Sequence, residues 1–192
     1  MTDTIDTLLG RSSASSLAEP APSGAVLERI LATALRAPDH GRLRPWRFLT
    51  VRGAARETLA ALVADAVRRR EPDAPDVFVE KQRNKFLRAP LVLVLGARIA
   101  ASPKVPEIEQ VMSVAAGTMN VLNALHAEGF GGIWVTGATS YDPAIQVALG
   151  FAPPDRLLGF LFIGTPTAVA DRPSPRRPDL SDHLADWTVP AA

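Results

Sequence analysis

The alternation of apolar and polar residues predicts a domain in which four strands alternate with helices. Short apolar runs at residues 46–51, 91–97, 130–136 and 157–164 have the length and composition of strands. The run at 91–97 is apolar throughout, which indicates a strand buried on both faces. Between the runs, apolar residues recur three and four positions apart. This spacing predicts helices at 2–9, 23–36, 54–70, 78–88, 107–128 and 144–149.

The glycine-rich stretch Gly129–Gly137 has an unusual composition. Four of its nine residues are glycine, yet it also carries Phe130, Ile133 and Trp134. Glycine within a strand often marks a close approach of the backbone to another group. We therefore expect Gly129 to end a helix and residues 130–136 to form a short, flat element on which a planar ligand can lie. An ordinary buried strand after a helix cap is the alternative.

The helix predicted at 107–128 carries apolar residues around almost its whole circumference. A helix of this kind has to be covered on all sides. In a chain of 192 residues, a second subunit is a simple way to provide part of that cover. We predict a dimer interface here, with the central core helix of a monomer as the alternative.

Two polar loops hold candidate binding residues. Gly10–Ser16 combines Arg11 with several hydroxyl side chains, which suits a phosphate group, although a solvated linker has the same composition. Arg36 is expected in the last turn of its helix, before Pro38. The loop that follows contains His40 and several arginines, which favour a neutral imidazole.

Length and composition indicate one domain over residues 1–192, with 47% hydrophobic and 21% charged residues. The segment 166–192 is rich in proline and poor in apolar residues, so we expect an extended tail that is disordered or packs on a partner subunit. Its arginines are candidates for a phosphate contact; they are Arg172, Arg176 and Arg177.

Several classes of function are disfavoured. A net charge of +1 gives no field for nucleic acid or an anionic membrane. The chain has no cysteine and no signal-peptide pattern, which is compatible with the cytoplasm, and none of its apolar runs has the composition of a membrane span. No metal-ligand spacing, G-x-G-x-x-G fingerprint, phosphate-binding loop of NTPases or Gly-x-Ser-x-Gly elbow is present.

Six motifs in order resemble the flavin-dependent nitroreductase family, in particular its small YdjA-like NAD(P)H nitroreductase branch. The resemblance spans residues 3–166. The motifs are Arg11-Ser12-Ser13-Ala14-Ser15 with Leu17-Ala18-Glu19-Pro20-Ala21-Pro22, Arg36-Ala37-Pro38-Asp39-His40, Pro45-Trp46, Arg88-Ala89-Pro90-Leu91, Gly129-Phe130-Gly131-Gly132-Ile133-Trp134 with Gly137, and Gly159-Phe160-Leu161 with Gly164-Thr165-Pro166.

The resemblance implies an α+β fold with a mixed, mainly antiparallel central sheet flanked by helices. It implies a homodimer with a long interface helix and one FMN per subunit at the interface. Arg11, Ser12 and Ser13 would hold the phosphate and ribityl chain of FMN. The flavin ring would lie along the strand formed by Trp134, Val135 and Thr136.

The resemblance also implies contacts from two other regions. Arg36 and His40 would reach the FMN of the partner subunit. The region of NAD(P)H binding would lie at the end of the long helix, in the residues Ala124, Leu125, His126, Ala127, Glu128 and Gly129. No side chain is assigned as a catalytic acid, base or nucleophile, because the flavin would carry the chemistry.

The sequence departs from the family pattern at three positions. The family commonly has a second arginine where Ser12 stands and another basic residue near Ser16. Gln usually precedes the Pro-Trp pair, whereas this chain has Arg44. Phosphate affinity could be reduced by these changes, or Arg44, Arg176 and Arg177 could supply the missing charge.

The expected activity is ping-pong hydride transfer from NADH or NADPH to FMN and then to a nitroaromatic, quinone or similar small acceptor. Two alternatives remain open. One is an FMN-binding or electron-carrying protein that turns over poorly with NAD(P)H. The other is a cofactor-free structural dimer, in which Gly129–Gly137 is only a turn and a strand.

Overall fold

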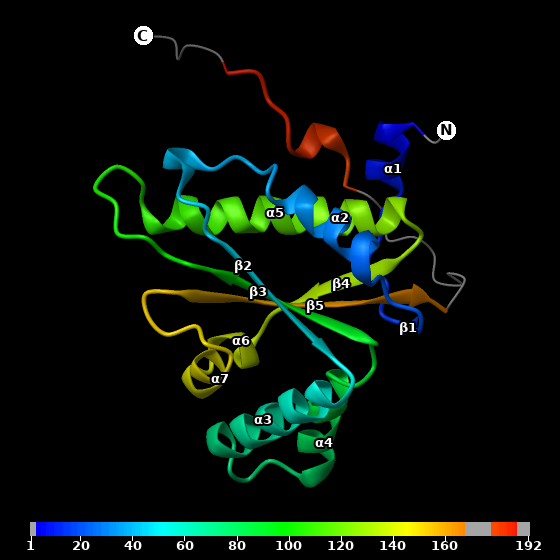
Figure 1. Ribbon diagram of the computed structural model, residues 1–192, viewed down its shortest axis with the longest axis vertical. Helices are drawn as coiled ribbons and strands as arrows, with labels where there is room; N and C mark the ends of the chain where they lie inside the picture. The colour runs from blue at the N-terminus through cyan, green and yellow to red at the C-terminus, as the bar shows by residue number, and fades with distance from the viewer. Residues whose placement is uncertain (1–2, 168–177, 188–192) are drawn as a thin grey trace.

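A five-stranded sheet lies at the centre of the computed structural model, which describes residues 3–167 and 178–187 (Figure 1). Every strand pair in these ranges is antiparallel. The strands are β1 (Leu17–Ala18), β2 (Trp46–Arg52), β3 (Leu91–Ala97), β4 (Gly131–Val135) and β5 (Arg156–Pro166). The four predicted strands are confirmed, and the two-residue β1 is an addition too short to leave an apolar pattern.

Strand β5 organises the sheet because it pairs along both of its edges. One edge pairs with β3, which pairs in turn with β2. The other edge pairs first with β4, opposite residues 160–164, and then with β1, opposite Thr165 and Pro166. Strands β4 and β1 therefore follow one another along a single edge of β5.

The core is divided into two layers by β3, whose seven residues are all buried. Leu91, Leu93 and Leu95 face one hydrophobic cluster, whereas Val92 and Val94 face the other. The alternation of side chains along a strand explains this division. The sequence-based prediction of a strand buried on both faces is confirmed.

Helices cover both faces of the sheet (Figure 1). Helix α5 (Glu107–Ala127) lies on one face, with α2 (Gly24–Ala34) and α1 (Thr4–Gly10) packed against it. The other face is covered by α3 (Ala54–Arg70), α4 (Asp76–Lys85), α6 (Ala138–Tyr141) and α7 (Pro143–Ala148). Two single 3-10 turns occur at His40–Arg42 and Leu180–Asp182.

Some helix ends follow from local sequence. The Asp142 carboxylate accepts hydrogen bonds from the backbone N–H groups of Ala144 and Ile145 at 3.0 and 3.1 Å, and Pro143 occupies the first helical position of α7. The Asp3 carboxylate caps α1 in the same way. Gly129, with φ of 81°, leads the chain out of α5.

Three expectations need correction. Helix α2 ends at Ala34, with Leu35 as its C-cap, so Arg36 lies beyond the helix and not in its last turn. Helix α4 spans Asp76–Lys85 and starts and stops earlier than the predicted 78–88. The sheet was predicted to be mixed and mainly antiparallel; its antiparallel character is confirmed, and no parallel pair occurs within residues 3–167 and 178–187.

The two sides of α5 have different surroundings. Its buried residues include Val121, Leu122 and Leu125, which pack toward the sheet. Ile108, Met112 and Met119 are 61%, 61% and 39% exposed. Their spacing of four and seven residues places them on one side of the helix, so a single chain leaves an apolar stripe uncovered.

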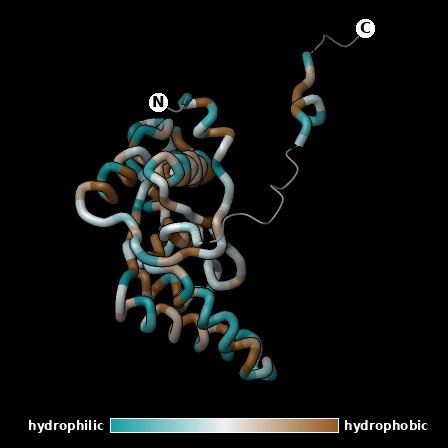
Figure 2. Tube along the Cα trace, turned by 90° about the vertical axis from the view of Figure 1, so that its right-hand side faces the viewer, coloured by the Kyte–Doolittle hydropathy of each residue, from teal (hydrophilic) through white to brown (hydrophobic). Residues whose placement is uncertain are grey.

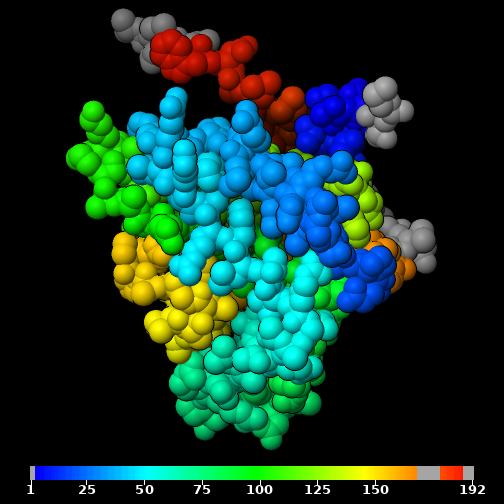
Figure 3. Space-filling view, in the orientation of Figure 1, coloured from blue at the N-terminus to red at the C-terminus, as the bar shows by residue number. Residues whose placement is uncertain are grey.

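Residues 178–187 lie apart from the sheet and its helices (Figures 2 and 3). All ten are exposed, including Leu180, Leu184 and Trp187. The backbone N–H and the hydroxyl of Ser181 donate hydrogen bonds to the Asp179 carboxylate, and these bonds lower the pKa of Asp179. Arg172, Arg176 and Arg177, together with most of the predicted tail, lie outside the described residues.

Candidate functional site

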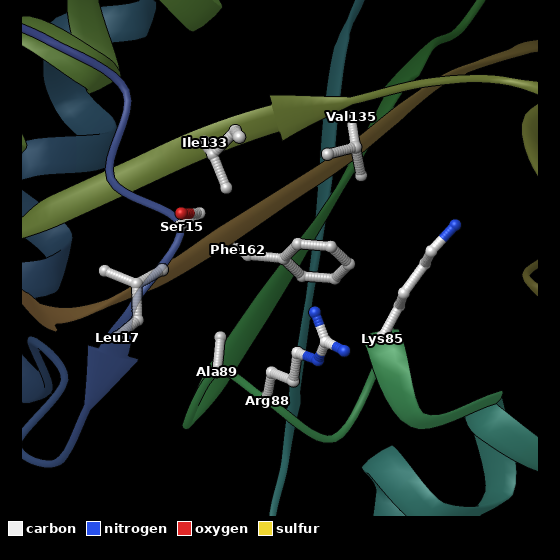
Figure 4. Close-up of a pocket in the computed structure, with 8 residues that line it drawn as sticks. All are labelled: Ser15, Leu17, Lys85, Arg88, Ala89, Ile133, Val135 and Phe162. Atoms are coloured by element: carbon white, nitrogen blue, oxygen red, sulfur yellow. The ribbon is translucent and has the colours of Figure 1, made fainter. Parts of the chain in front are cut away.

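A pocket of about 160 Å³ opens between the edge strand β4 and the end of α4 (Figure 4). Its floor is apolar, and two cationic side chains stand at its wall. The residues that line it are Ser15, Leu17, Lys85, Arg88, Ala89, Ile133, Val135 and Phe162. They come from four segments that are far apart in the sequence.

The floor of the pocket is set by strand alternation. Ile133 and Val135 lie two residues apart on β4, so their side chains point to the same face. Phe162 on β5 is the register partner of Ile133. Figure 4 shows these three side chains turned toward the same space. The result is a short apolar surface at the edge of the sheet.

Glycine allows the N-terminal loop to approach β4 closely. A Cβ atom at Gly131 would lie 2.7 Å from Pro166 Cγ and 2.9 Å from Ala14 Cβ. The backbone N–H of Ala14 donates a hydrogen bond to the carbonyl of Gly132 at 3.2 Å. The loop that carries Arg11 to Ser15 is thereby held along the outer edge of β4.

The cationic wall comes from the end of α4 and the turn that leads to β3. Lys85 is the last residue of α4 and extends toward Val135 in Figure 4. Arg88 lies in the turn, between two carbonyls that accept hydrogen bonds from Arg56 Nη1: Leu87 at 3.2 Å and Ala89 at 2.7 Å. Phe86, between Lys85 and this turn, packs edge-on against Phe160 and Phe162. The wall is thus fixed to both α3 and the sheet.

Arg11, Ser12 and Ser13 lie in the loop beside this pocket. The Nε atom of Arg11 is buried and has no hydrogen-bond partner within residues 3–167 and 178–187. Ser12 and Ser13 are exposed. An unpartnered buried donor is unfavourable by about 1–3 kcal/mol, so Arg11 Nε–H lacks a compensating contact in the described part of the chain. None of the three residues is among those that line the pocket.

The three predicted residues of β4 and its end lie in different surroundings. Val135 lines the pocket. Trp134 points to the opposite face, where it packs against the α5 side of the core and its Nε1–H donates to the carbonyl of Leu158 at 3.1 Å. Thr136 is exposed just beyond the strand. Only the main chain of Trp134 can therefore face a ligand in this pocket.

Arg36 and His40 do not line the pocket of their own chain. Both are exposed in the loop that follows α2. His40 Nδ1 lies 2.5 Å from a carboxylate oxygen of Glu109 at the start of α5. Arg44 has a positive φ of 52° and is also exposed, in the same loop. None of these residues lines the pocket as Arg88 and Lys85 do.

The region predicted to bind NAD(P)H contains both exposed and buried residues. His126, Ala127, Glu128 and Gly129 are exposed, Ala124 is partly buried and Leu125 is fully buried. Glu128 forms an ion pair of 2.5 Å with Arg29 of α2. The exposed end of α5 is thus tied to α2, while the Leu125 side chain belongs to the core.

Across the described ranges, no three His, Asp or Glu side chains come together in a group that could hold a metal ion. No helix in the same ranges is both long enough and apolar enough to cross a membrane.

Val135 is the one residue of the pocket lining that was predicted to be a site residue, and the charged lining residues Lys85 and Arg88 were not. Arg88 belongs to the Arg-Ala-Pro motif, but that motif was only an indicator of resemblance. Lys85 stands in a helix with several other charged residues, and nothing local distinguishes it from them. The packing of α4 on α3, together with Phe86 against Phe160 and Phe162 of β5, brings these two cations to the pocket.

The arrangement suits a ligand that is flat and carries negative charge. Branched and aromatic side chains offer a flat surface to a planar ring, and arginine and lysine favour anionic groups. At about 160 Å³, the pocket is smaller than the roughly 300–1,000 Å³ typical of ligand sites. One chain therefore encloses only part of a ligand of that size.

Comparison with known proteins identifies the family of this fold. The model of the nitroreductase family matches residues 8–165. The chain is similar to "Putative NAD(P)H nitroreductase YdjA" of Escherichia coli (strain K12), with 40% identity over 164 residues that cover 85% of this chain and 88% of that protein. It is also similar to "Putative NAD(P)H nitroreductase" of Haemophilus influenzae, with 34% identity over 171 residues, 88% of this chain and 92% of that protein.

Solved structures with low sequence identity share the fold. A nitroreductase-like family protein from Bacillus cereus superposes with a TM-score of 0.83 at 20% identity, covering 97% of both chains. A Desulfovibrio desulfuricans protein, whose structure is described as a "putative nitroreductase in complex with fmn", superposes with a TM-score of 0.74 at 20% identity, covering 99% of both. The chain therefore belongs to the nitroreductase family, in agreement with the resemblance to its YdjA-like branch.

Proposed function

We propose that this chain is an FMN-dependent NAD(P)H oxidoreductase that works as a homodimer. The observation that carries the proposal is the pocket over Ile133, Val135 and Phe162, with Lys85 and Arg88 at its wall. The FMN described for the Desulfovibrio desulfuricans relative and the NAD(P)H in the names of the bacterial relatives support the choice of cofactor and donor.

The residues present fit FMN in three respects. The apolar floor suits the isoalloxazine ring, and the backbone of Trp134 to Thr136 runs along it. Arg11 has a buried Nε without a partner in the described structure, which suits the phosphate, with Ser12 and Ser13 beside it. Lys85 and Arg88 offer positive charge to the polar edge of the ring or to the ribityl chain.

The bound flavin would supply the redox chemistry, by accepting a hydride from NADH or NADPH and passing electrons to a nitroaromatic, quinone or similar acceptor in ping-pong order. The chain's own residues would position and hold the cofactor. Ser15 is the one hydroxyl side chain in the lining, no His, Asp or Glu lines the pocket beside it, and the titratable lining groups are the two cations. We therefore assign no acid–base residue.

The homodimer is supported by the surface of α5. Ile108, Met112 and Met119 form an exposed apolar stripe, and the exposed apolar residues Ile5, Leu8 and Leu9 lie on α1, which packs on the same helix. Exposed apolar residues gathered on two helices that pack together are typical of an interaction surface. A second copy would cover the stripe and complete the small pocket, and Arg36 and His40 would reach the FMN of that copy.

The proposal is tested by titrating the purified protein with FMN while the visible flavin spectrum is recorded. We expect saturable binding with perturbed absorbance in the wild type. Val135→Trp should abolish binding because the indole would fill the pocket, whereas Val147→Trp, at a position that is 63% exposed on α7, should bind normally. A wild-type protein that does not bind FMN would refute the proposal and favour a cofactor-free dimer.

A second measurement separates an enzyme from an electron carrier. In stopped-flow mixing, NADH or NADPH should bleach the bound flavin rapidly, and an acceptor should then restore its absorbance. Flavin that binds well but is bleached only slowly by both donors would assign the protein to the carrier class.

A further inference from the structure

The pair formed by His40 and Glu109 joins two segments that the sequence separates by 69 residues. His40 Nδ1 lies 2.5 Å from Glu109 Oε2, and the two side chains are 59% and 41% exposed. An exposed ion pair contributes little to stability, typically about 0.2–1 kcal/mol. The contact therefore adds little to the stability of the fold, and its main effect is on the orientation of the imidazole ring.

The main chain that carries His40 is held on both sides. The Asp39 carboxylate accepts hydrogen bonds from the backbone N–H groups of Leu43 at 3.1 Å and Arg44 at 2.9 Å. Gly41 adopts a φ of 72°, and a Cβ there would lie 3.0 Å from Val105 Cγ2. The loop is thus fixed, and the direction of the imidazole ring is left to Glu109.

The pair stands beside the apolar stripe of α5. Glu109 lies in the first turn of the helix, next to Ile108 and three residues before Met112. Both apolar neighbours are 61% exposed. His40 therefore borders the surface that we propose to face the second copy.

Hydrogen-bond chemistry determines what this arrangement offers to a ligand. An ionised carboxylate can only accept, so Nδ1 must carry the hydrogen that it shares with Glu109. In the neutral imidazole, Nε2 is then left as a hydrogen-bond acceptor. Without Glu109, neutral histidine commonly carries its hydrogen on Nε2, which reverses the role of that atom.

We infer that Glu109 is a positioning residue that holds His40 in the Nδ1–H form, with Nε2 presented as an acceptor to the flavin of the partner subunit. The groups that fit this acceptor are a ribityl hydroxyl and the imide N–H of the ring. The inference rests on the proposed function, because it assumes that a flavin lies at the interface.

The first experiment measures the tautomer directly, in the protein without cofactor. The chain has three histidines, so imidazole nitrogen resonances can be assigned by replacing each one in turn. At a pH where the ring is neutral, we expect His40 as Nδ1–H in the wild type and as Nε2–H in Glu109→Ala. Glu107→Ala is the matched control: Glu107 lies in the same helical turn, but its carboxylate binds Arg156 at 2.7 and 3.1 Å.

The second experiment measures FMN affinity in a double-mutant cycle. His40→Ala and Glu109→Ala should each weaken binding about three- to tenfold, and the double variant should be no weaker than His40→Ala, because Glu109 acts through His40. Glu107→Ala should bind FMN like the wild type. Glu109→Gln, whose amide oxygen can still accept from Nδ1, should retain most of the affinity.

The outcomes distinguish this inference from the proposed function. The inference is overturned if His40 is Nε2–H in the wild type, or if Glu109→Ala behaves like Glu107→Ala while FMN still binds. If the wild type binds no FMN, the proposed function fails first, and the flavin-facing role of His40 fails with it.

Discussion

Strands β3 and β4 both pair with β5, but they have opposite characters. All seven residues of β3 are buried, and the strand is paired along both edges. In β4 only Gly131 and Gly132 are buried, and within the described residues its one strand partner is β5. The comparison teaches that the two strands have different structural roles: β3 holds the two layers together, and β4 leaves an edge at which other segments meet, where we propose that the ligand binds.

The glycines of β4 explain how other segments can approach its edge closely. Side chains at Gly131 would keep the N-terminal loop away from the sheet, whereas at β3 the large side chains fill the core on both faces. If the division is correct, changes in β3 should reduce stability, and changes near β4 should mainly reduce ligand affinity.

The largest expected effect is on stability. Leu93→Ala removes a fully buried side chain from the centre of β3 and should lower the free energy of unfolding by about 2–5 kcal/mol. Urea denaturation of the wild type and of Leu93→Ala would measure this difference in the free energy of unfolding. Leu35→Ala, at a position that is 56% exposed, should change stability by less than about 0.5 kcal/mol. Equal effects of the two substitutions would contradict the central role of β3.

The next largest expected effect is on FMN affinity. Arg11→Ala should weaken FMN binding by about 1.5–3 kcal/mol, because a charge-assisted hydrogen bond to the phosphate is lost. The free energy of unfolding without FMN should not fall. Flavin titration and denaturation would test both statements, with Arg68→Ala as a control, since Arg68 pairs with Asp76. Unchanged FMN affinity would remove Arg11 from the phosphate site.

The third prediction concerns the close approach at β4. Gly131→Ala places a methyl group against Pro166 and Ala14, and it should destabilise the fold by about 1–3 kcal/mol and weaken FMN binding as the loop is displaced. Gly132→Ala is the matched control on the opposite face, where the nearest atoms are the ends of three leucine side chains at 3.3 Å. Thermal melting followed by circular dichroism, and flavin titration, would measure both effects in both variants. The prediction is wrong if Gly132→Ala lowers the stability or the FMN affinity more than Gly131→Ala does.

The smallest expected effect is a gain in FMN affinity. Ser12→Arg restores the second arginine that the family commonly has, and at this exposed position it should tighten FMN binding by about 0.2–1 kcal/mol. The gain should shrink as salt is added, because exposed charges are screened. A titration at two salt concentrations would measure it. Weaker binding by the variant would indicate that the phosphate is held elsewhere.

Much of the fold could be predicted from the sequence because local rules determine it. The apolar run of β3, the Asp142-Pro143 start of α7 and the glycine after α5 each have a local physical cause, and the structure follows them. Arg36 is one exception, and the bounds of α4 are another. Helix α2 ends two residues earlier than Pro38 suggested, a difference that local sequence does not determine.

The pocket could be predicted only in part. Val135 was expected at a flavin site on the strength of the family resemblance, and it does line the pocket. Lys85 and Arg88 were not expected, because their position depends on how α4 and the turn held by Arg56 pack on the sheet. Spatial neighbours drawn from distant segments leave no spacing pattern in the sequence.

The loop that carries Arg36 and His40 has a consequence for how the protein would be loaded in a cell. Neither residue lines the pocket of its own chain, so a site that uses them is assembled only when two copies meet. Mass action then links cofactor occupancy to the amount of protein. On dilution, the copies would separate and release the flavin together, so the measured FMN affinity should rise with protein concentration.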